Sequence, residues 1–137
     1  ACLGAVALGT WLAGCAATRY TAPTLTHDGL RLNLSEFLLE GSSHAAYRSY
    51  VVVHHEALRF PICVFRFSTT EYVALWMECS HLGAELQATD TLLQCPAHGS
   101  EFDRQGQVTS GPADAPLRSF PVTVSDRELF LDLRATV

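Results

Sequence analysis

Short runs of Val, Leu, Ile, Phe and Tyr recur along most of the chain, and Gly, Pro, Ser and Asp separate them. Several runs alternate apolar and polar residues, as at Leu30, Leu32 and Leu34, which is typical of a strand with one buried face. Turns are expected at 68–70 and 125–127, where Ser, Thr and Asp gather. The pattern therefore predicts a small, antiparallel, all-β domain. Its strands are expected at 29–34, 49–54, 61–67, 71–78, 91–95, 100–103, 119–124 and 128–133.

Two stretches fit the strand pattern less well. Residues 33–41 (NLSEFLLEG) are compatible with one helical turn, with Ser35 as its N-cap. Residues 19–28 are polar and contain Pro23, so they are expected to form a linker. The folded domain is then expected to occupy residues 29–137.

The most apolar part of the chain is its beginning. Residues 1–18 contain no charged residue, and the first charge is Arg19. This run is at the short end of the roughly 17–25 residues that a transmembrane helix needs. It is interpreted either as the apolar core of a signal segment or as a hydrophobic helix retained as a membrane anchor.

The residues before Cys15 bear on this choice. The sequence Leu12-Ala13-Gly14-Cys15 resembles a bacterial lipobox, in which the Cys is lipidated and the residues before it are removed. Cys15 is therefore a candidate lipidation site, and the alternative is that residues 1–14 are retained. Both interpretations predict a domain tethered to a bacterial membrane through its N-terminus, on the periplasmic or other extracytoplasmic side.

Composition limits the function classes. The chain has 137 residues, of which 48% are hydrophobic and 17% charged, so a single domain with a sizeable core is expected. The formal net charge is −5. Nucleic-acid binding needs clustered positive charge, so a nucleic-acid partner is not expected, whereas a neutral or basic protein partner is compatible with this charge.

The residues with metal-binding chemistry lie in two short segments, 79–83 (CSHLG) and 95–100 (CPAHGS). Each segment supplies one Cys and one His, and thiolate with imidazole suits soft and borderline metals. A structural zinc site can use the same four residues. Zinc fingers, however, usually pair Cys with Cys and His with His along the chain, so the mixed segments favour an iron–sulfur cluster. The candidate ligands are Cys79, His81, Cys95 and His98.

These segments resemble the Rieske family, whose pattern is C-x-H-x-G followed by C-P-x-H-G-S. The resemblance covers about residues 48–133, and every fixed position matches. It implies stacked antiparallel sheets with a small cluster-binding part at about 79–118. It also implies a 2Fe-2S cluster in which two Cys and two His are the ligands. Replacing two thiolates by neutral imidazoles raises the reduction potential, to roughly −150 to +300 mV in this class.

The resemblance also assigns roles to residues around the ligands. Leu82 matches a leucine that lies beside the cluster, and Gly83 and Gly99 match fixed glycines. Ser100 matches a serine whose hydroxyl donates a hydrogen bond to cluster sulfur. Pro112 lies in a segment that looks like the family's proline-containing loop, which covers the cluster.

Two departures from the family pattern predict a lower potential than in its high-potential members. Those members have a Tyr two residues after the serine, and Phe102 stands here. Quinol-oxidising members of cytochrome bc-type complexes also have a disulfide between the two loops, and Ala84 and Ala97 occupy its positions. Cys63 is the remaining Cys of the domain, and its apolar strand predicts a small buried hydrophobic residue.

Among the other residues, Trp76 and Met77 are expected to pack beneath the cluster loops. The sequence therefore predicts a membrane-tethered one-electron carrier, with a redox partner such as a cytochrome. The alternatives are the Rieske subunit of a quinol:cytochrome oxidoreductase, with quinol as a partner, and an accessory subunit of a respiratory or photosynthetic complex. A cytosolic ferredoxin is less compatible with the apolar beginning of the chain. No nucleophile–base constellation supports independent catalysis.

Overall fold

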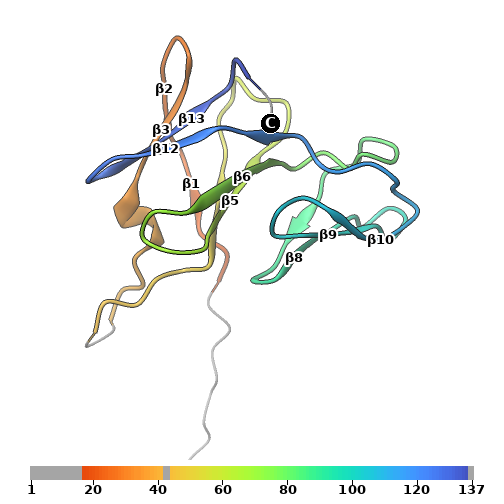
Figure 1. Ribbon diagram of the computed structural model, residues 1–137, viewed down its shortest axis with the longest axis horizontal. Coiled ribbons are helices and arrows are strands. Elements are labelled where there is room, and N and C mark those ends of the chain that lie inside the picture. Colours follow the sequence, from red (N-terminus) through yellow and green to blue (C-terminus); the bar gives the residue numbers. More distant parts are fainter. Residues whose placement is uncertain (1–16, 42–43, 136–137) are drawn as a thin grey trace, which may run out of the picture.

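The computed structural model describes residues 17–41 and 44–135, and the regular secondary structure of this part of the chain is almost entirely β-strand (Figure 1). The strands form three sheets, with the orders β1-β4-β5-β6-β11, β12-β13-β3-β2 and β10-β9-β8-β7. The elements are β1 (Tyr20–Thr21), β2 (Thr24–Leu25), β3 (Gly29–Asn33), the 3-10 helix η1 (Leu34–Phe37), β4 (Tyr50–Val53), β5 (Ile62–Arg66), β6 (Tyr72–Trp76), β7 (Gln87–Ala88), β8 (Leu92–Gln94), β9 (Glu101–Asp103), β10 (Val108–Ser110), β11 (Ser119–Phe120), β12 (Val122–Val124) and β13 (Glu128–Asp132).

The five-stranded sheet is central because hydrophobic cores lie on both of its faces. One core joins alternate residues of β4 and β5, such as Val51 and Ile62, to leucines of β3 and β13. The other core contains the intervening residues, such as Val52 and Cys63, with side chains from β8 and β9. Burial on both faces explains why β4 and β5 read as continuous apolar runs without alternation.

The all-β prediction is confirmed, and each expected strand is present in the structure. The run 119–124 is divided at Pro121, which lacks a backbone donor, so that β11 pairs with β6 while β12 pairs with β13. This division lets one segment connect the central sheet with its neighbour. Sequence reasoning missed the short strands β1, β2, β7 and β10.

Two local expectations are corrected by the structure. The expected linker 19–28 contributes strands instead, since β1 pairs in parallel with β4 and β2 pairs with β3. The expected helical turn exists as η1, but its cap is Asn33, whose side chain accepts a hydrogen bond from the Ser35 amide at 2.9 Å. Ser35 lies inside the turn.

The predicted hydrophobic helix at 1–18 and the candidate lipidation site Cys15 lie almost wholly outside the described residues, which begin at Ala17. Within the described ranges, none of the helical segments has the length and hydrophobicity needed to cross a membrane.

Candidate metal centre

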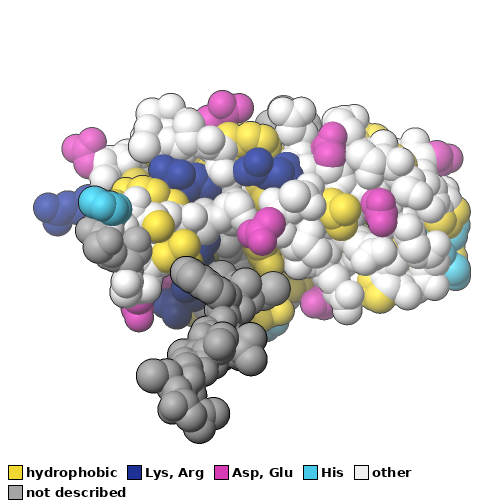
Figure 2. All heavy atoms as spheres, turned by 90° about the horizontal axis from the view of Figure 1, so that it is seen from below, with side chains coloured by type: hydrophobic (Ala, Val, Ile, Leu, Met, Phe, Trp, Pro, Cys, Tyr) yellow, Lys and Arg dark blue, Asp and Glu magenta, His cyan; other side chains and the backbone are white. Residues whose placement is uncertain are grey.

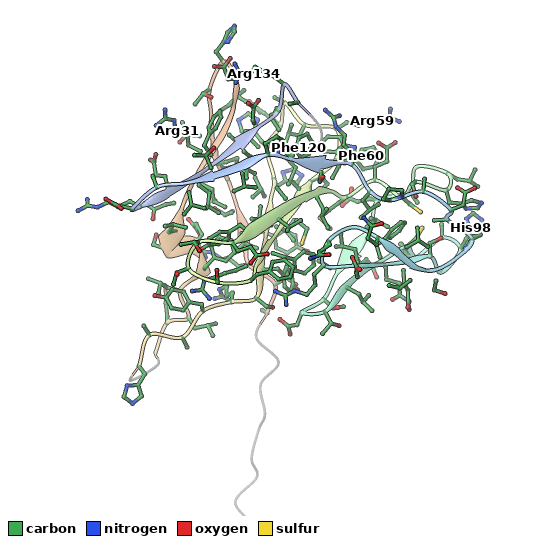
Figure 3. All side chains as sticks on the ribbon, viewed as in Figure 1. Arg31, Arg59, Phe60, His98, Phe120 and Arg134 are labelled. Atoms are coloured by element: carbon green, nitrogen blue, oxygen red, sulfur yellow. The ribbon has the colours of Figure 1, made fainter. Side chains whose placement is uncertain are left out.

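The four candidate ligands lie on two loops at one end of the molecule, where the third sheet extends beyond the central one. Figure 3 labels His98 at this end. The first loop joins β6 to β7. Its Gly83 amide donates to the Cys79 carbonyl at 2.9 Å, and the Cys79 amide donates to the Ala84 carbonyl at 2.8 Å. Gly83 has a φ of +79°, a backbone conformation that favours glycine.

The second loop, between β8 and β9, repeats this backbone design. The Gly99 amide donates to the Cys95 carbonyl at 3.0 Å, and the Cys95 amide donates to the Ser100 carbonyl at 2.8 Å. Gly99 has a φ of +82°. Each motif glycine therefore closes a tight turn that begins at its cysteine, which explains why the two segments carry glycine at matching places.

The two loops place the two candidate cysteines next to each other and the two candidate histidines next to each other. The Cys79 and Cys95 thiols lie within hydrogen-bonding contact, and each residue is 2% exposed. The imidazole rings of His81 and His98 meet edge to face, with centroids 5.1 Å apart. His98 is exposed, whereas Nδ1 of His81 is buried and has no hydrogen-bond partner in the described part of the chain. The sulfur pair is thus inside and the nitrogen pair nearer the surface.

The surroundings of Cys95 favour its thiolate form. Burial raises the pKa of this thiol, but backbone hydrogen bonds from His98 and Ala97 and the side chain of Cys79 outweigh it and lower the pKa. Cys63 is the opposite case, because it is fully buried and burial raises the pKa of its thiol. Thiolates bind metals, so Cys95 is suited to this role, and Cys63 is the buried hydrophobic residue that was expected.

A proline-containing segment, 111–118, contacts both loops, donating one hydrogen bond to Ser100 and accepting another from Ser80. The Ser80 hydroxyl donates to the Ala115 carbonyl at 2.6 Å. The Ser100 hydroxyl oxygen accepts a hydrogen bond from the Ala113 amide at 3.0 Å. Ser100 is 0% exposed, and within the described residues its hydroxyl hydrogen has no acceptor, so it can donate to a bound group. Pro112, in the same segment, is exposed.

The other residues named from the sequence lie around these loops. Leu82 is 72% exposed, whereas Phe102 is fully buried in the same core as the two loop cysteines. Met77 packs in that core, as expected. Trp76 does not, because it belongs to the opposite core and donates from Nε1 to Glu78 at 2.8 Å. Neighbouring residues of an extended chain point to opposite faces of the sheet, which explains the difference.

Glu78 is a residue that sequence reasoning missed. Its Oε1 lies 3.2 Å from the position that a Cβ at Gly83 would take, so the carboxylate rests against the first loop. A side chain at position 83 would therefore crowd it. The only sequence signal was an acidic residue directly before Cys79, at the end of an apolar strand.

The donor set fits a 2Fe-2S group better than a single ion. Within the described residues, no three His, Cys, Asp or Glu side chains are placed to hold one metal ion. The donors instead form a buried sulfur pair next to an imidazole pair that includes an unpartnered ring nitrogen. This arrangement matches a group with two iron centres, one bound by thiolates and the other by imidazoles.

Comparisons with known proteins agree with this chemistry. A family model of the Rieske [2Fe-2S] domain matches residues 42–121, more than half of the chain. The cytochrome b6-f complex iron-sulfur subunit 2 of Nostoc sp. is 37% identical over 65 residues, which cover 46% of this chain and 36% of that subunit. Subunit 1 of Synechocystis sp. is 40% identical over 55 residues, which cover 39% and 31%. The matches span about a third of the length of these relatives.

Among solved structures, a plasma-membrane Rieske protein of the cyanobacterium Synechocystis has the same fold. It aligns with a TM-score of 0.54 and 23% identity, over 61% of this chain and 86% of the other. The chain therefore belongs to the Rieske [2Fe-2S] family, and it is an iron–sulfur electron carrier whose domain binds a 2Fe-2S cluster.

Proposed function

We propose that this protein is a membrane-tethered one-electron carrier on the extracytoplasmic side of a bacterial membrane. Its cluster is held by Cys79 and Cys95 on one iron and by His81 and His98 on the other. The observation that carries this proposal is the pairing of thiols with thiols and imidazoles with imidazoles across two loops of equivalent backbone geometry. When bound, the cluster accepts and releases single electrons, and its imidazole ligands raise the potential.

The chain's own residues adjust this chemistry. The free hydroxyl hydrogen of Ser100 is available to a cluster sulfur, and such a bond favours the reduced, more negative state. Phe102 has no hydroxyl, so it supplies no second bond of this kind. Leu82, within the first ligand loop, is exposed, and its match to the family leucine makes it the side chain proposed to shield the cluster.

The tether is proposed from the sequence. Residues 1–18 lack charge, and Cys15 follows a lipobox-like sequence, so the protein is held to the membrane either by a lipid on Cys15 or by a retained apolar segment. An electron-transfer domain on such a tether exchanges electrons with partners at the membrane surface. A cytochrome is the kind of acceptor that this arrangement suits.

The second candidate function is that of the Rieske subunit in a quinol:cytochrome oxidoreductase, with quinol as the donor. It is favoured by the similarity to cytochrome b6-f iron-sulfur subunits. Ala84 and Ala97 at the disulfide positions and Phe102 count against it, because they predict a lower potential. An accessory redox subunit of a larger respiratory or photosynthetic complex is compatible with the same residues. Purification with a b-type cytochrome and quinol-dependent reduction of the cluster would favour the oxidoreductase.

The ligand assignment is tested by iron and acid-labile sulfide analysis of the purified full chain. The expected result is about two of each per chain, as a 2Fe-2S cluster requires. Cys79→Ser, His81→Ala, Cys95→Ser and His98→Ala should each lose the cluster. Cys63→Ala, which removes a buried thiol outside the loops, should retain it. Retention of the normal cluster in a His98→Ala protein, or zinc in place of iron, would contradict the proposal.

A further inference from the structure

Three arginines lie close together at the end of the central sheet where the described chain begins, although the Arg66 side chain follows Ile62 and Val64 on one face of β5 and Arg104 packs on Phe65 and Phe67 of the other. Arg48 donates from Nη1 to the Ala17 carbonyl at 3.2 Å. The Arg66 amide donates to the Ser49 carbonyl at 2.8 Å, and Arg104 donates from Nη2 to the Arg66 carbonyl at 2.7 Å. We call these three side chains, Arg48, Arg66 and Arg104, the arginine face. Figure 2 shows arginine side chains gathered on this side of the molecule.

The charges of the arginine face are not neutralised within the domain. In the described ranges, none of its three guanidinium groups has a carboxylate within salt-bridge distance, whereas Arg19 pairs with Glu36 at 2.9 Å. The Nε atoms of all three are buried and lack hydrogen-bond partners among the described residues. Asp90 is the acidic residue of the pocket that Arg48 lines, and it accepts a hydrogen bond from the Ser49 hydroxyl. The face is therefore positive on a chain whose net charge is −5.

Aromatic rings hold two of these guanidinium groups in place. The Arg66 guanidinium lies 4.0 Å from the centroid of the Tyr47 ring, and that of Arg104 lies 4.2 Å from the Phe67 centroid. Such cation–π contacts fix the side chains without removing their charge. Because these guanidinium groups have already lost much of their conformational freedom, binding of an anionic ligand costs less conformational entropy.

Exposed apolar side chains surround the same region. Tyr47 is 44% exposed, and Leu38, with which it forms a β-bridge, is 41% exposed. Tyr20, three residues after Ala17, is 67% exposed. Tyr side chains favour the boundary between membrane and water, and arginine favours anionic headgroups. Positive charge, tyrosine and leucine together are the chemistry of a surface that rests on lipid.

We infer that the arginine face docks on a bilayer that contains anionic lipid. The inference rests on the proposed membrane tether, because residues 1–16 precede Ala17 at this face and carry no charge. Figure 3 places His98 at one end of the molecule's long axis, whereas the described chain begins midway along its lower side. Docking therefore holds the cluster loops to the side, along the membrane surface, where a partner in the same membrane can reach them.

The first test measures arginine modification on vesicles. The full chain is mixed with vesicles of phosphatidylcholine alone, or of phosphatidylcholine with phosphatidylglycerol, and treated with phenylglyoxal. Mass spectrometry then reports modification at each arginine. The three face arginines should be protected several-fold on the anionic vesicles only, and added salt should remove the protection. Arg31, Arg59 and Arg134, on the opposite side in Figure 3, serve as internal controls and should react equally in every sample.

The second test uses charge variants and vesicle sedimentation. Each arginine at an anionic surface strengthens binding about fivefold, equivalent to about 1 kcal/mol. The double variant Arg66→Gln/Arg104→Gln should therefore lower the ratio of anionic to neutral vesicle binding roughly 25-fold. Arg66→Lys/Arg104→Lys keeps the charge and should retain most of the ratio. The matched control Arg31→Gln/Arg134→Gln removes the same net charge from the opposite side and should leave the ratio nearly unchanged.

The outcomes distinguish a failure of the docking inference from a failure of the proposed function. Equal protection on neutral and anionic vesicles, or equal loss in the two Gln variants, overturns the docking surface. If the three arginines become protected without lipid as the protein concentration rises, the arginine face binds a second copy of the chain. That result also overturns docking on lipid. If the chain does not bind neutral vesicles but its face arginines are protected on anionic ones, the proposed tether is refuted. The inferred docking surface is then retained.

Discussion

Replacing Ser100 by Ala is the perturbation whose consequences follow most directly from the structure. The Ser100 hydroxyl is fully buried, and its oxygen accepts the Ala113 amide at 3.0 Å. Its hydrogen is free to donate toward the proposed cluster site. The substitution therefore removes two interactions at once, one that holds the proline-containing segment and one that acts on the cluster.

The two losses have different sizes and different readouts. The buried Ala113 amide is left without its acceptor, which costs about 1–3 kcal/mol of stability. A hydrogen bond to a charged group contributes about 1.5–3 kcal/mol, and here it favours the reduced cluster. For one electron, about 1.4 kcal/mol corresponds to about 59 mV. Ser100→Ala should therefore lower the midpoint potential by about 60–130 mV.

The assay is a redox titration of the purified protein followed by EPR, alongside urea unfolding. Ser80→Ala is a matched control, because the Ser80 hydroxyl also holds the proline-containing segment but donates its hydrogen to the Ala115 carbonyl. It should lower stability modestly and change the potential little. Equal potential shifts in the two variants would refute the reasoning, because the effect of Ser100 would then come from positioning the segment.

Three further predictions concern stability. Cys63→Ser places a hydroxyl in a fully buried site, so the unfolding free energy in urea should fall by about 1–3 kcal/mol while the EPR signal is unchanged; full stability would contradict the burial. Gly106→Ala should lower Tm more than Gly41→Ala, and equal shifts would oppose this. Both glycines have positive φ, +85° and +81°, but a Cβ at 106 would lie 2.9 Å from a leucine side chain of β6, whereas a Cβ at 41 would have no atom of the described residues within 4 Å. The hydrogen bond from the Arg134 side chain lowers the pKa of Asp132 from 3.8 to about 2, so its stabilising contribution, present above about pH 4, is lost as pH falls toward 2. Asp132→Asn should flatten this part of the acid-unfolding curve followed by circular dichroism, and superimposable curves would count against the ion pair.

Sequence reasoning predicted the strands that are long enough to show a recognisable pattern of apolar residues. β3 and β13 alternate clearly because one face of each is buried. β1, β2 and β7 have two residues each, and they exist because a neighbouring strand pairs with them. Such short polar strands carry no local pattern. The interpretation of residues 19–28 as a linker failed for this reason.

The candidate ligands could be found because their spacing is a local property of the chain. Cys79 and His81 are two residues apart, and each motif glycine closes the turn that begins at its cysteine. The contact of Ser80 with Ala115 joins residues 35 positions apart, and the neighbouring positions of Arg66 and Arg104 depend on the packing of two sheets. Neither was visible in the sequence. Long-range contacts of this kind appear only in the folded protein.

The measurement that tests the central claim most directly is a redox titration of the purified full chain, monitored by low-temperature EPR. The account predicts a Rieske-type signal that appears on one-electron reduction. It also predicts a midpoint within roughly −150 to +300 mV and below the top of that range, because Phe102 replaces the tyrosine of high-potential members and Ala84 and Ala97 replace the cysteines of their disulfide. An iron-free protein that binds zinc, or a midpoint near −400 mV as in clusters with four Cys ligands, would contradict it.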